Sequence, residues 1–108
     1  MKVKTLLSGL VLVASSFSAA WAQTYPTKTI SLIVPYPAGG PSDFFARRVQ
    51  PDASAKLGAT MIIENVGGAG GAIGMSRLIN APADGHTLSA GSPMELVLAP
   101  MAIQGVKY

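Results

Sequence analysis

The chain of 108 residues contains no cysteine and only one histidine, His86. The lack of cysteine excludes a disulfide framework and thiolate metal sites, and a single histidine argues against a histidine-based metal centre. Charged residues are also scarce, at 12% of the chain, and no Gly-Lys-Ser/Thr triplet of a phosphate-binding loop occurs. We therefore expect no metal, no cofactor and no catalytic residue in this chain.

The first 22 residues have the three-part pattern of a secretory signal peptide. Lys2 and Lys4 form a basic start, an apolar run covers 5–13, and Ala20-Trp21-Ala22 supplies the small-x-small cleavage pattern. The apolar run is too short for a membrane anchor, which needs roughly 18 or more consecutive apolar residues. We predict cleavage before Gln23 and export of the remaining chain.

The net charge of +3 gives no support to a nucleic-acid partner, because part of it belongs to the leader. Without Lys2 and Lys4, six basic residues stand against five acidic ones. Arg47-Arg48 is the only adjacent basic pair, and it is expected on the solvated edge of a helix. No dense basic patch remains that could hold a phosphate backbone.

Segments with the pattern of strands and segments with helical spacing alternate along residues 23–108. Apolar, β-branched runs predict strands, and apolar residues three and four positions apart predict helices. Strands are expected at 29–36, 60–65 and 86–91, and helices at 43–57, 72–80 and from 93 to about 100.

Several residues predict where these helices begin and end. Ser42 or Asp43 is expected to cap the first helix, and Gly58 to end it. Pro51 lacks an N–H donor, so a kink or two short helices meeting there is expected. Ser92-Pro93-Met94-Glu95 reads as a capping box with proline at the first helical position, and Pro100 is expected to end that last helix.

The order β-α-β-α-β-α predicts an α/β fold with a parallel sheet and right-handed crossovers. Three strands leave at least one sheet edge and one helix layer without partners. Domains of this size are also marginally stable when alone. We therefore expect residues 23–108 to be the N-terminal part of a larger binding unit.

Two glycine-rich loops follow the first two predicted strands, at 35–43 and 65–74. In an open α/β sheet, ligands bind beyond the carboxyl ends of the strands, where helix N-termini carry partial positive charge. Neither loop contains lysine or arginine, so an anion there would be held by backbone N–H groups. A carboxylate or a small phosphate would suit such a place. The glycine spacing of a dinucleotide site is missing, because Ile73 stands where its third glycine belongs.

Other interpretations of the loops stay open on these residues alone. Glycines of this kind also serve as tight turns that pack a helix closely on a strand. A secreted α/β enzyme could use the loops as an oxyanion or phosphate site, although the serines have only His86 as a base and no G-x-S-x-G elbow is present. A non-functional truncated fragment is the third interpretation.

Three segments together resemble the Bug-type solute-binding proteins of tripartite tricarboxylate transporters. They are "YPTKTISLIVPYPAGGPSD" at 25–43, "IIENVGGAGGAIG" at 62–74 and "ADGHTLSAGS" at 83–92. The resemblance implies a two-lobed periplasmic binding protein of the type II-like fold, roughly three times this length, of which this chain holds the beginning of the first lobe. It also implies that the protein closes over a small mono- or dicarboxylate and delivers it to membrane subunits.

The resemblance further implies which residues receive the ligand, through main-chain amides and ordered waters. By position they are Tyr36, Ala38, Gly39, Gly40, Ser42 and Asp43 in the first loop, Gly68, Ala69, Gly70 and Gly71 in the second, and Ser92 in the third. Asp43 is expected to cap the first helix or to hold a ligand ammonium, since a carboxylate would repel a carboxylate.

The chain departs from the family pattern at four places. Pro41 stands where the first loop usually continues with a small residue, and Val66-Gly67 replaces the usual Arg-Pro or Lys-Pro. Pro51 interrupts a helix that is normally free of proline, and Pro93-Met94-Glu95 replaces the usual polar residues of the third loop. These departures concern the choice of ligand more than the fold.

Overall fold

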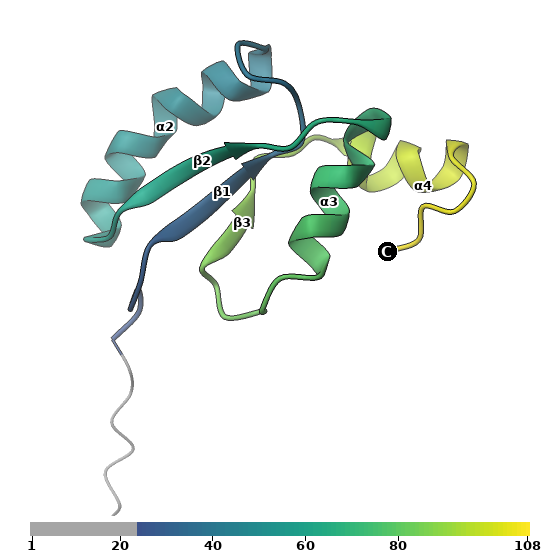
Figure 1. Cartoon of the computed structure of the whole chain (residues 1–108). Coiled ribbons are helices and arrows are strands. Elements are labelled where there is room, and N and C mark those ends of the chain that lie inside the picture. The colour runs from purple at the N-terminus through teal and green to yellow at the C-terminus, as the bar shows by residue number, and fades with distance from the viewer. Residues whose placement is uncertain (1–23) are drawn as a thin grey trace, which may run out of the picture.

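The structure is a computed structural model that describes residues 24–108 (Figure 1). The predicted signal peptide lies outside the described residues. The described chain forms a parallel sheet of three strands with helices on both of its faces, so the predicted α/β class is confirmed.

The strands are β1 (Ile30–Val34), β2 (Met61–Asn65) and β3 (Thr87–Ser89), in the sheet order β2-β1-β3. Both pairings are parallel, with Ile30 opposite Met61 and Ser31 opposite Thr87. Each strand is shorter than the sequence predicts. β1 ends before Pro35, whose missing N–H cannot continue a ladder.

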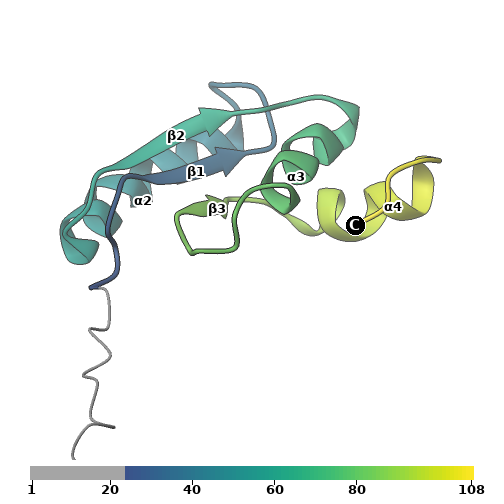
Figure 2. The ribbon, with the colours of Figure 1, turned by 60° about the horizontal axis from the view of Figure 1, so that its bottom comes forward.

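The central position of β1 decides where the helices lie. The connections from β1 to β2 and from β2 to β3 run in opposite directions across the sheet. Right-handed crossovers then require the helices of these connections to cover opposite faces. α2 (Pro41–Leu57) packs on one face and α3 (Ala72–Ile79) on the other, as Figures 1 and 2 show. β1 is covered on both sides, and its residues Ile30 and Val34 are fully buried.

α2 begins earlier than the sequence predicts. Its N-cap is Gly40, which makes no side-chain capping bond, and Pro41 occupies the first turn. The expectation that Ser42 or Asp43 caps this helix is wrong, because the fixed φ of Pro41 and its missing N–H suit the first helical position. The predicted end is confirmed, since Gly58 takes a left-handed conformation with φ of 65°.

Pro51 lies inside α2, which is one helix of 17 residues rather than two short ones. The carbonyl that Pro51 leaves without a helical partner belongs to Arg47. Both residues lie on the exposed side of the helix, where water can take the place of the missing donor.

The last helical segment begins at Pro93, as the capping box predicts. It continues as a π-helical turn, η2 (Met94–Leu98), and as α4 (Ala99–Ala102). The expectation that Pro100 ends the helix is wrong by two residues. The N–H of Ala99 donates to the carbonyl of Met94, five residues earlier, so the chain widens just before the proline that cannot donate.

The small core contains the inward side chains of β1 and one side of each helix, with Ala46, Met75 and Ala99 all buried. Several large apolar side chains remain exposed, including Phe44 at 67% and Met101 at 79%. Within residues 24–108, none of the helices is both long enough and apolar enough to cross a bilayer.

Candidate ligand-binding site at the carboxyl ends of the strands

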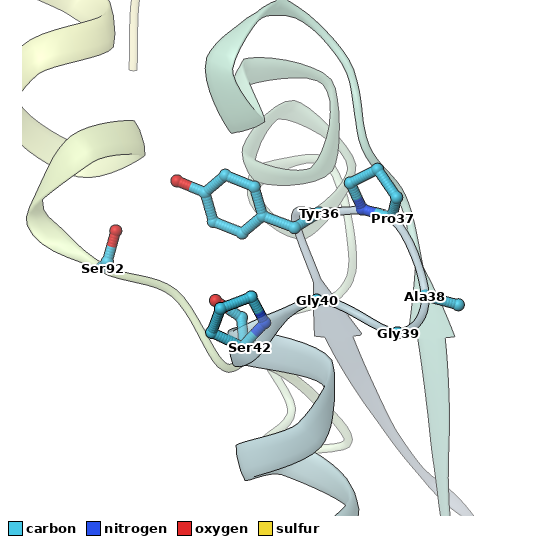
Figure 3. A pocket seen from close by; sticks show the side chains of 8 residues that line it. Tyr36, Pro37, Ala38, Gly39, Gly40, Ser42 and Ser92 are labelled. Carbon is cyan, nitrogen blue, oxygen red and sulfur yellow. The ribbon is translucent and has the colours of Figure 1, made fainter.

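A pocket of about 600 Å³ lies beside the carboxyl end of β1 (Figure 3). The segments that follow β1 and β3 form it. The chain adds β2 on one side of β1 and then β3 on the other side, so the strand order reverses between β1 and β3. Open α/β sheets bind ligands at such a switch point. The pocket is lined by Tyr36, Pro37, Ala38, Gly39, Gly40, Pro41, Ser42 and Ser92.

Six of the predicted site residues therefore meet around one pocket. They are Tyr36, Ala38, Gly39, Gly40, Ser42 and Ser92. The structure brings Ser92 to the first loop although 50 or more residues separate them along the chain. Asp43 and the second-loop residues Gly68, Ala69, Gly70 and Gly71 are not among the lining residues of this pocket.

The N-terminus of α2 lies at the pocket. The first helical bond runs from the N–H of Phe44 to the carbonyl of Gly40, at 2.9 Å. The N–H groups of Gly40 and Ser42 precede that bond, and such groups at a helix start have no carbonyl partner within the helix. The N–H of Gly39 is already engaged, because it donates to Oδ2 of Asp43 at 2.8 Å.

Asp43 holds the first loop in place through hydrogen bonds to its carboxylate. Its buried carboxylate accepts hydrogen bonds from Nε of Arg47 at 3.0 Å, from the N–H of Gly39 and from Nδ2 of Asn65. The bond from Arg47, followed by that from Gly39, lowers the pKa of Asp43 to about 2. Asp43 is therefore ionised at neutral pH, and its lone pairs are used by groups of the protein.

Glu95 is the buried centre of the third loop. Its carboxylate accepts hydrogen bonds from the hydroxyls of Tyr36 and Ser92, both at 2.8 Å, and from the N–H of Ser92. The last bond is one half of the predicted capping box. In place of the other half, the hydroxyl of Ser92 accepts the N–H of Met94 at 3.3 Å. Burial alone would raise the pKa of Glu95, but the hydrogen bonds to its carboxylate outweigh burial and lower it.

Tyr36 responds to the same carboxylate. The neighbouring hydroxyl of Ser92 lowers the pKa of Tyr36, but the hydrogen bond to Glu95, burial and the charge of Glu95 together raise it. Tyr36 therefore stays protonated, and its hydroxyl donates a hydrogen bond to Glu95. Glu95 was not among the predicted site residues. The capping box and the position of Glu95 in the third loop were the signals that could have found it.

The second glycine loop carries the chain from β2 across the end of β1 to the opposite face. A Cβ on Gly67 would lie 3.1 Å from Cδ of Pro37, and one on Gly74 would lie 2.9 Å from Cα of Pro35. Gly71 is buried against Glu95, where a Cβ would come within 2.7 Å of that residue's Cβ. These glycines let the chain and α3 pack closely on the end of β1.

The other predicted residues of the second loop face outward. Gly68, Ala69 and Gly70 are exposed and begin a short 3-10 turn, η1 (Ala69–Gly71). Their positive φ angles of 120°, 47° and 63° produce the sharp turn from β2 into α3. Gly70 has open space around it, since the nearest atom to an added Cβ would be Cδ1 of Ile103 at 3.8 Å.

The structure separates the candidate base from the serines of the loops. His86 precedes β3 and so lies at the amino ends of the strands, whereas Ser42 and Ser92 follow strands at the carboxyl ends. The ring of His86 accepts the N–H of Thr27 at 3.1 Å and bonds to the carbonyl of Asp84. Within residues 24–108, His86 therefore forms no nucleophile and base pair with these serines.

Comparison with known proteins gives a family that agrees with this site. The profile described as the tripartite tricarboxylate transporter family receptor matches residues 45–108. The chain belongs to this receptor family. A UPF0065 protein of Bordetella bronchiseptica is 38% identical over 105 residues, which cover 97% of this chain and 31% of that protein. The chain thus spans about a third of the length of this relative.

Two solved structures are similar to this chain in both sequence and fold. The periplasmic binding protein BugD is 40% identical, with a TM-score of 0.58 over 60% of this chain and 22% of that one. MatC of Rhodopseudomonas palustris, solved with bound malate, is also 40% identical, with a TM-score of 0.58 and the same coverage. The described fold therefore corresponds to part of a periplasmic binding protein.

Proposed function

We propose that this chain contributes to a periplasmic receptor that binds a small mono- or dicarboxylate. The pocket at the switch point carries this proposal. It lies against the N-terminus of α2, and no lysine or arginine is among its lining residues. An anion in the pocket would therefore be held by backbone N–H groups and by the helix dipole.

The physical chemistry of the pocket fits a carboxylate. A helix N-terminus combines unpaired N–H groups with partial positive charge, and carboxylates and phosphates bind at such places. Gly40 and Ser42 line the pocket and have N–H groups without a carbonyl partner in the helix, and Gly39 and Gly40 leave the main chain without bulky side chains. The family membership and the malate bound to MatC favour a carboxylate over a phosphate.

We assign roles to the predicted residues on this basis. Tyr36, Ala38, Gly39, Gly40, Ser42 and Ser92 surround the ligand, while Asp43 holds the first loop in shape. The second loop lies across the end of β1, and we assign it to another side of the ligand. It contributes the exposed residues Gly68, Ala69 and Gly70, and Gly71 lies behind them. Residues 23–108 then form the beginning of the first lobe, and a second lobe closes over the pocket.

The proposed receptor works outside the cytoplasm. The leader at 1–22 supplies the export signal, and relatives such as BugD are periplasmic binding proteins. Delivery of the carboxylate to the membrane subunits of a tripartite transporter follows from the family. No nucleic acid and no metal or cofactor takes part in this scheme.

Calorimetry on the full-length receptor that contains residues 23–108 tests the proposal. Succinate, malate and propionate are titrated beside succinamide, which has a similar shape but no charge. At least one acid is expected to bind at micromolar concentration, and succinamide is expected not to bind. Ser42→Ala is expected to weaken binding about three- to tenfold. Ser76→Ala, on the exposed face of α3, is the matched control.

Failure of every acid to bind would overturn the proposal. Equal binding of succinamide and succinate would also overturn it, because the helix dipole and the N–H groups would then not be selecting for an anion.

A further inference from the structure

Two hydroxyl groups on the pocket wall share one acceptor. The hydroxyls of Tyr36 and Ser92 both donate to Oε2 of Glu95, each at 2.8 Å. Tyr36 and Ser92 line the pocket from different loops, and Figure 3 shows the Tyr36 hydroxyl directed toward Ser92. Glu95 lies behind them with none of its surface exposed.

The direction of these hydrogen bonds is set by the charge of Glu95. Its hydrogen bonds keep the carboxyl ionised, as the lowered pKa indicates. An ionised carboxylate accepts hydrogen bonds and cannot donate them. Both hydroxyls must therefore direct their hydrogen toward Glu95. The other oxygen, Oε1, accepts the N–H of Ser92, so both carboxylate oxygens have partners.

Each hydroxyl has only one hydrogen, and Glu95 uses it. Tyr36 and Ser92 can then present only lone pairs to a ligand in the pocket. Ser92 already accepts one weak bond from the N–H of Met94 at 3.3 Å, which leaves it one further lone pair. This wall of the pocket accepts hydrogen bonds, whereas the wall at the N-terminus of α2 has N–H groups, at Gly40 and Ser42, without a carbonyl partner in the helix.

We infer that the pocket selects carboxylates that also carry a hydrogen-bond donor, a hydroxyl or an ammonium group, over their unsubstituted analogues. The ligand carboxylate accepts from the N-terminus of α2, and the donor group binds to the hydroxyl oxygens of Tyr36 and Ser92. Glu95 is the positioning residue that orients both hydroxyls. This inference rests on the proposed function and specifies its substrate class.

The energetics favour such a ligand for two reasons. A ligand without a donor would bury the lone pairs of two hydroxyls without partners, and unsatisfied buried polar groups are costly. A second carboxylate placed against this wall would meet acceptors backed by the negative charge of Glu95. Sites built to hydrogen-bond one group reject analogues that lack it far more strongly than apolar pockets reject a missing methylene.

Matched pairs of ligands test the inference on the full-length receptor. Malate and succinate differ by one hydroxyl, aspartate and succinate by one ammonium, and lactate and propionate by one hydroxyl. Calorimetry at neutral pH is expected to show at least one substituted acid bound about tenfold or more tightly than its unsubstituted partner. Tyr25→Phe, which removes a hydroxyl bonded to Gly85 away from the pocket, is expected to keep this ratio.

Two variants distinguish orientation of the hydroxyls from a purely structural role. Tyr36→Phe removes one acceptor and is expected to lower the ratio toward one. In Glu95→Gln, the amide oxygen accepts the N–H of Ser92, and the amide nitrogen faces the two hydroxyls. The hydroxyls must then turn a hydrogen into the pocket. For aspartate against succinate the ratio is expected to invert in favour of the unsubstituted acid, because an ammonium has no lone pair to accept these hydrogens. A loss of structure alone would not cause this inversion.

The outcomes separate this inference from the function on which it rests. If unsubstituted acids bind as tightly as substituted ones, the inference is overturned and the carboxylate receptor stands. If Tyr36→Phe leaves the ratio unchanged, the inference is also overturned, even where Glu95→Gln does not fold. If no acid of the three pairs binds, the proposed function fails together with it.

Discussion

Asn65, the last residue of β2, donates a hydrogen bond from Nδ2 to Oδ1 of Asp43 in the first turn of α2, at 3.0 Å. The same nitrogen lies 3.2 Å from the carbonyl of Tyr36 and donates to it as well. One amide group thus joins the end of β2 to the loop that follows β1. The shape of the pocket depends on this brace and on the ion pair of Asp43 with Arg47.

The brace predicts a specific dependence of stability on pH. The pKa of Asp43 is about 2 in the folded protein, below its ordinary value of 3.8. A lowered folded-state pKa contributes stability above the unfolded value, and this contribution is lost as the pH falls from about 4 to about 2. Asp43→Asn should be less stable than wild type at neutral pH, and the difference should shrink across this window. Denaturation midpoints at several pH values measure it.

The same substitution tests whether Asp43 contacts the ligand. Because its lone pairs are used by Arg47, Gly39 and Asn65, Asp43→Asn should leave binding of a simple dicarboxylate within about tenfold, or ~1.4 kcal/mol. Calorimetry provides the measurement. A larger loss would contradict this expectation.

Gly71 and Gly105 are a matched pair of positions that tests whether the glycine cluster serves close packing. Their φ angles are 92° and 93°, but a Cβ on Gly71 would lie 2.7 Å from Cβ of Glu95, whereas nothing lies within 4 Å of one on Gly105. Gly105→Ala should cost about 1 kcal/mol, for the backbone alone. Gly71→Ala should cost about 2–4 kcal/mol, because overpacking is added. Equal costs in denaturant unfolding of the full-length chain would contradict the packing role.

Gly70 tests the ligand-binding role of the exposed part of the second loop. Its φ of 63° and its open surroundings leave room for a side chain on the surface, although a β-branched residue is strained there. Gly70→Val should abolish carboxylate binding in calorimetry, because the side chain would block the approach of the ligand to the loop amides. Normal binding by this variant would show that the second loop serves packing alone.

The isolated segment 23–108 is expected to be a poor receptor by itself. Its described part exposes large apolar side chains, including Phe44, Val97 and Met101, and a single lobe cannot enclose a ligand. Such regions open locally with little free energy. Hydrogen exchange should therefore show weak protection, most of all in η2 and α4. Strong protection together with micromolar binding of a carboxylate would refute this expectation.

Export is expected to remove the leader after Ala22. The basic start and the Ala20-Trp21-Ala22 pattern lead to this prediction. Mass spectrometry of the protein recovered from the periplasm should give a chain that begins at Gln23. Recovery of a chain that still begins at Met1 would rule out cleavage.

Local signals in the sequence predicted much of the fold, because they act through the chain's own neighbours. The apolar β-branched runs predicted three parallel strands, and Gly58 and Pro93 marked a helix end and a helix start correctly. The errors were also local. Pro41 moved the start of α2, and of the two alternatives at Pro51, a kink or two short helices, the structure excludes the second.

Only some of the predicted site residues line the pocket, because the order of the strands decides which loops meet. The sequence predicted loops at the carboxyl ends of strands, and the family resemblance supplied the individual residues of the first loop and Ser92, six of which line the pocket. The strand order was decided only by tertiary packing, which placed β1 in the centre. That order joins the first and third loops at one pocket and sends the second loop across Pro35 and Pro37, where close packing requires glycine.

Local patterns in the sequence therefore predicted the α/β class and the element boundaries to within a few residues, and they led to the hypothesis of an anion site at the carboxyl-end loops. Only the tertiary structure decided which polar groups face the pocket. Glu95 is one charge among five acidic residues in the sequence. Its full burial beneath Tyr36 and Ser92 makes it an acceptor of two hydroxyl hydrogens. Hydrogen-bond direction depends on contacts between residues distant in the chain, which no local pattern encodes.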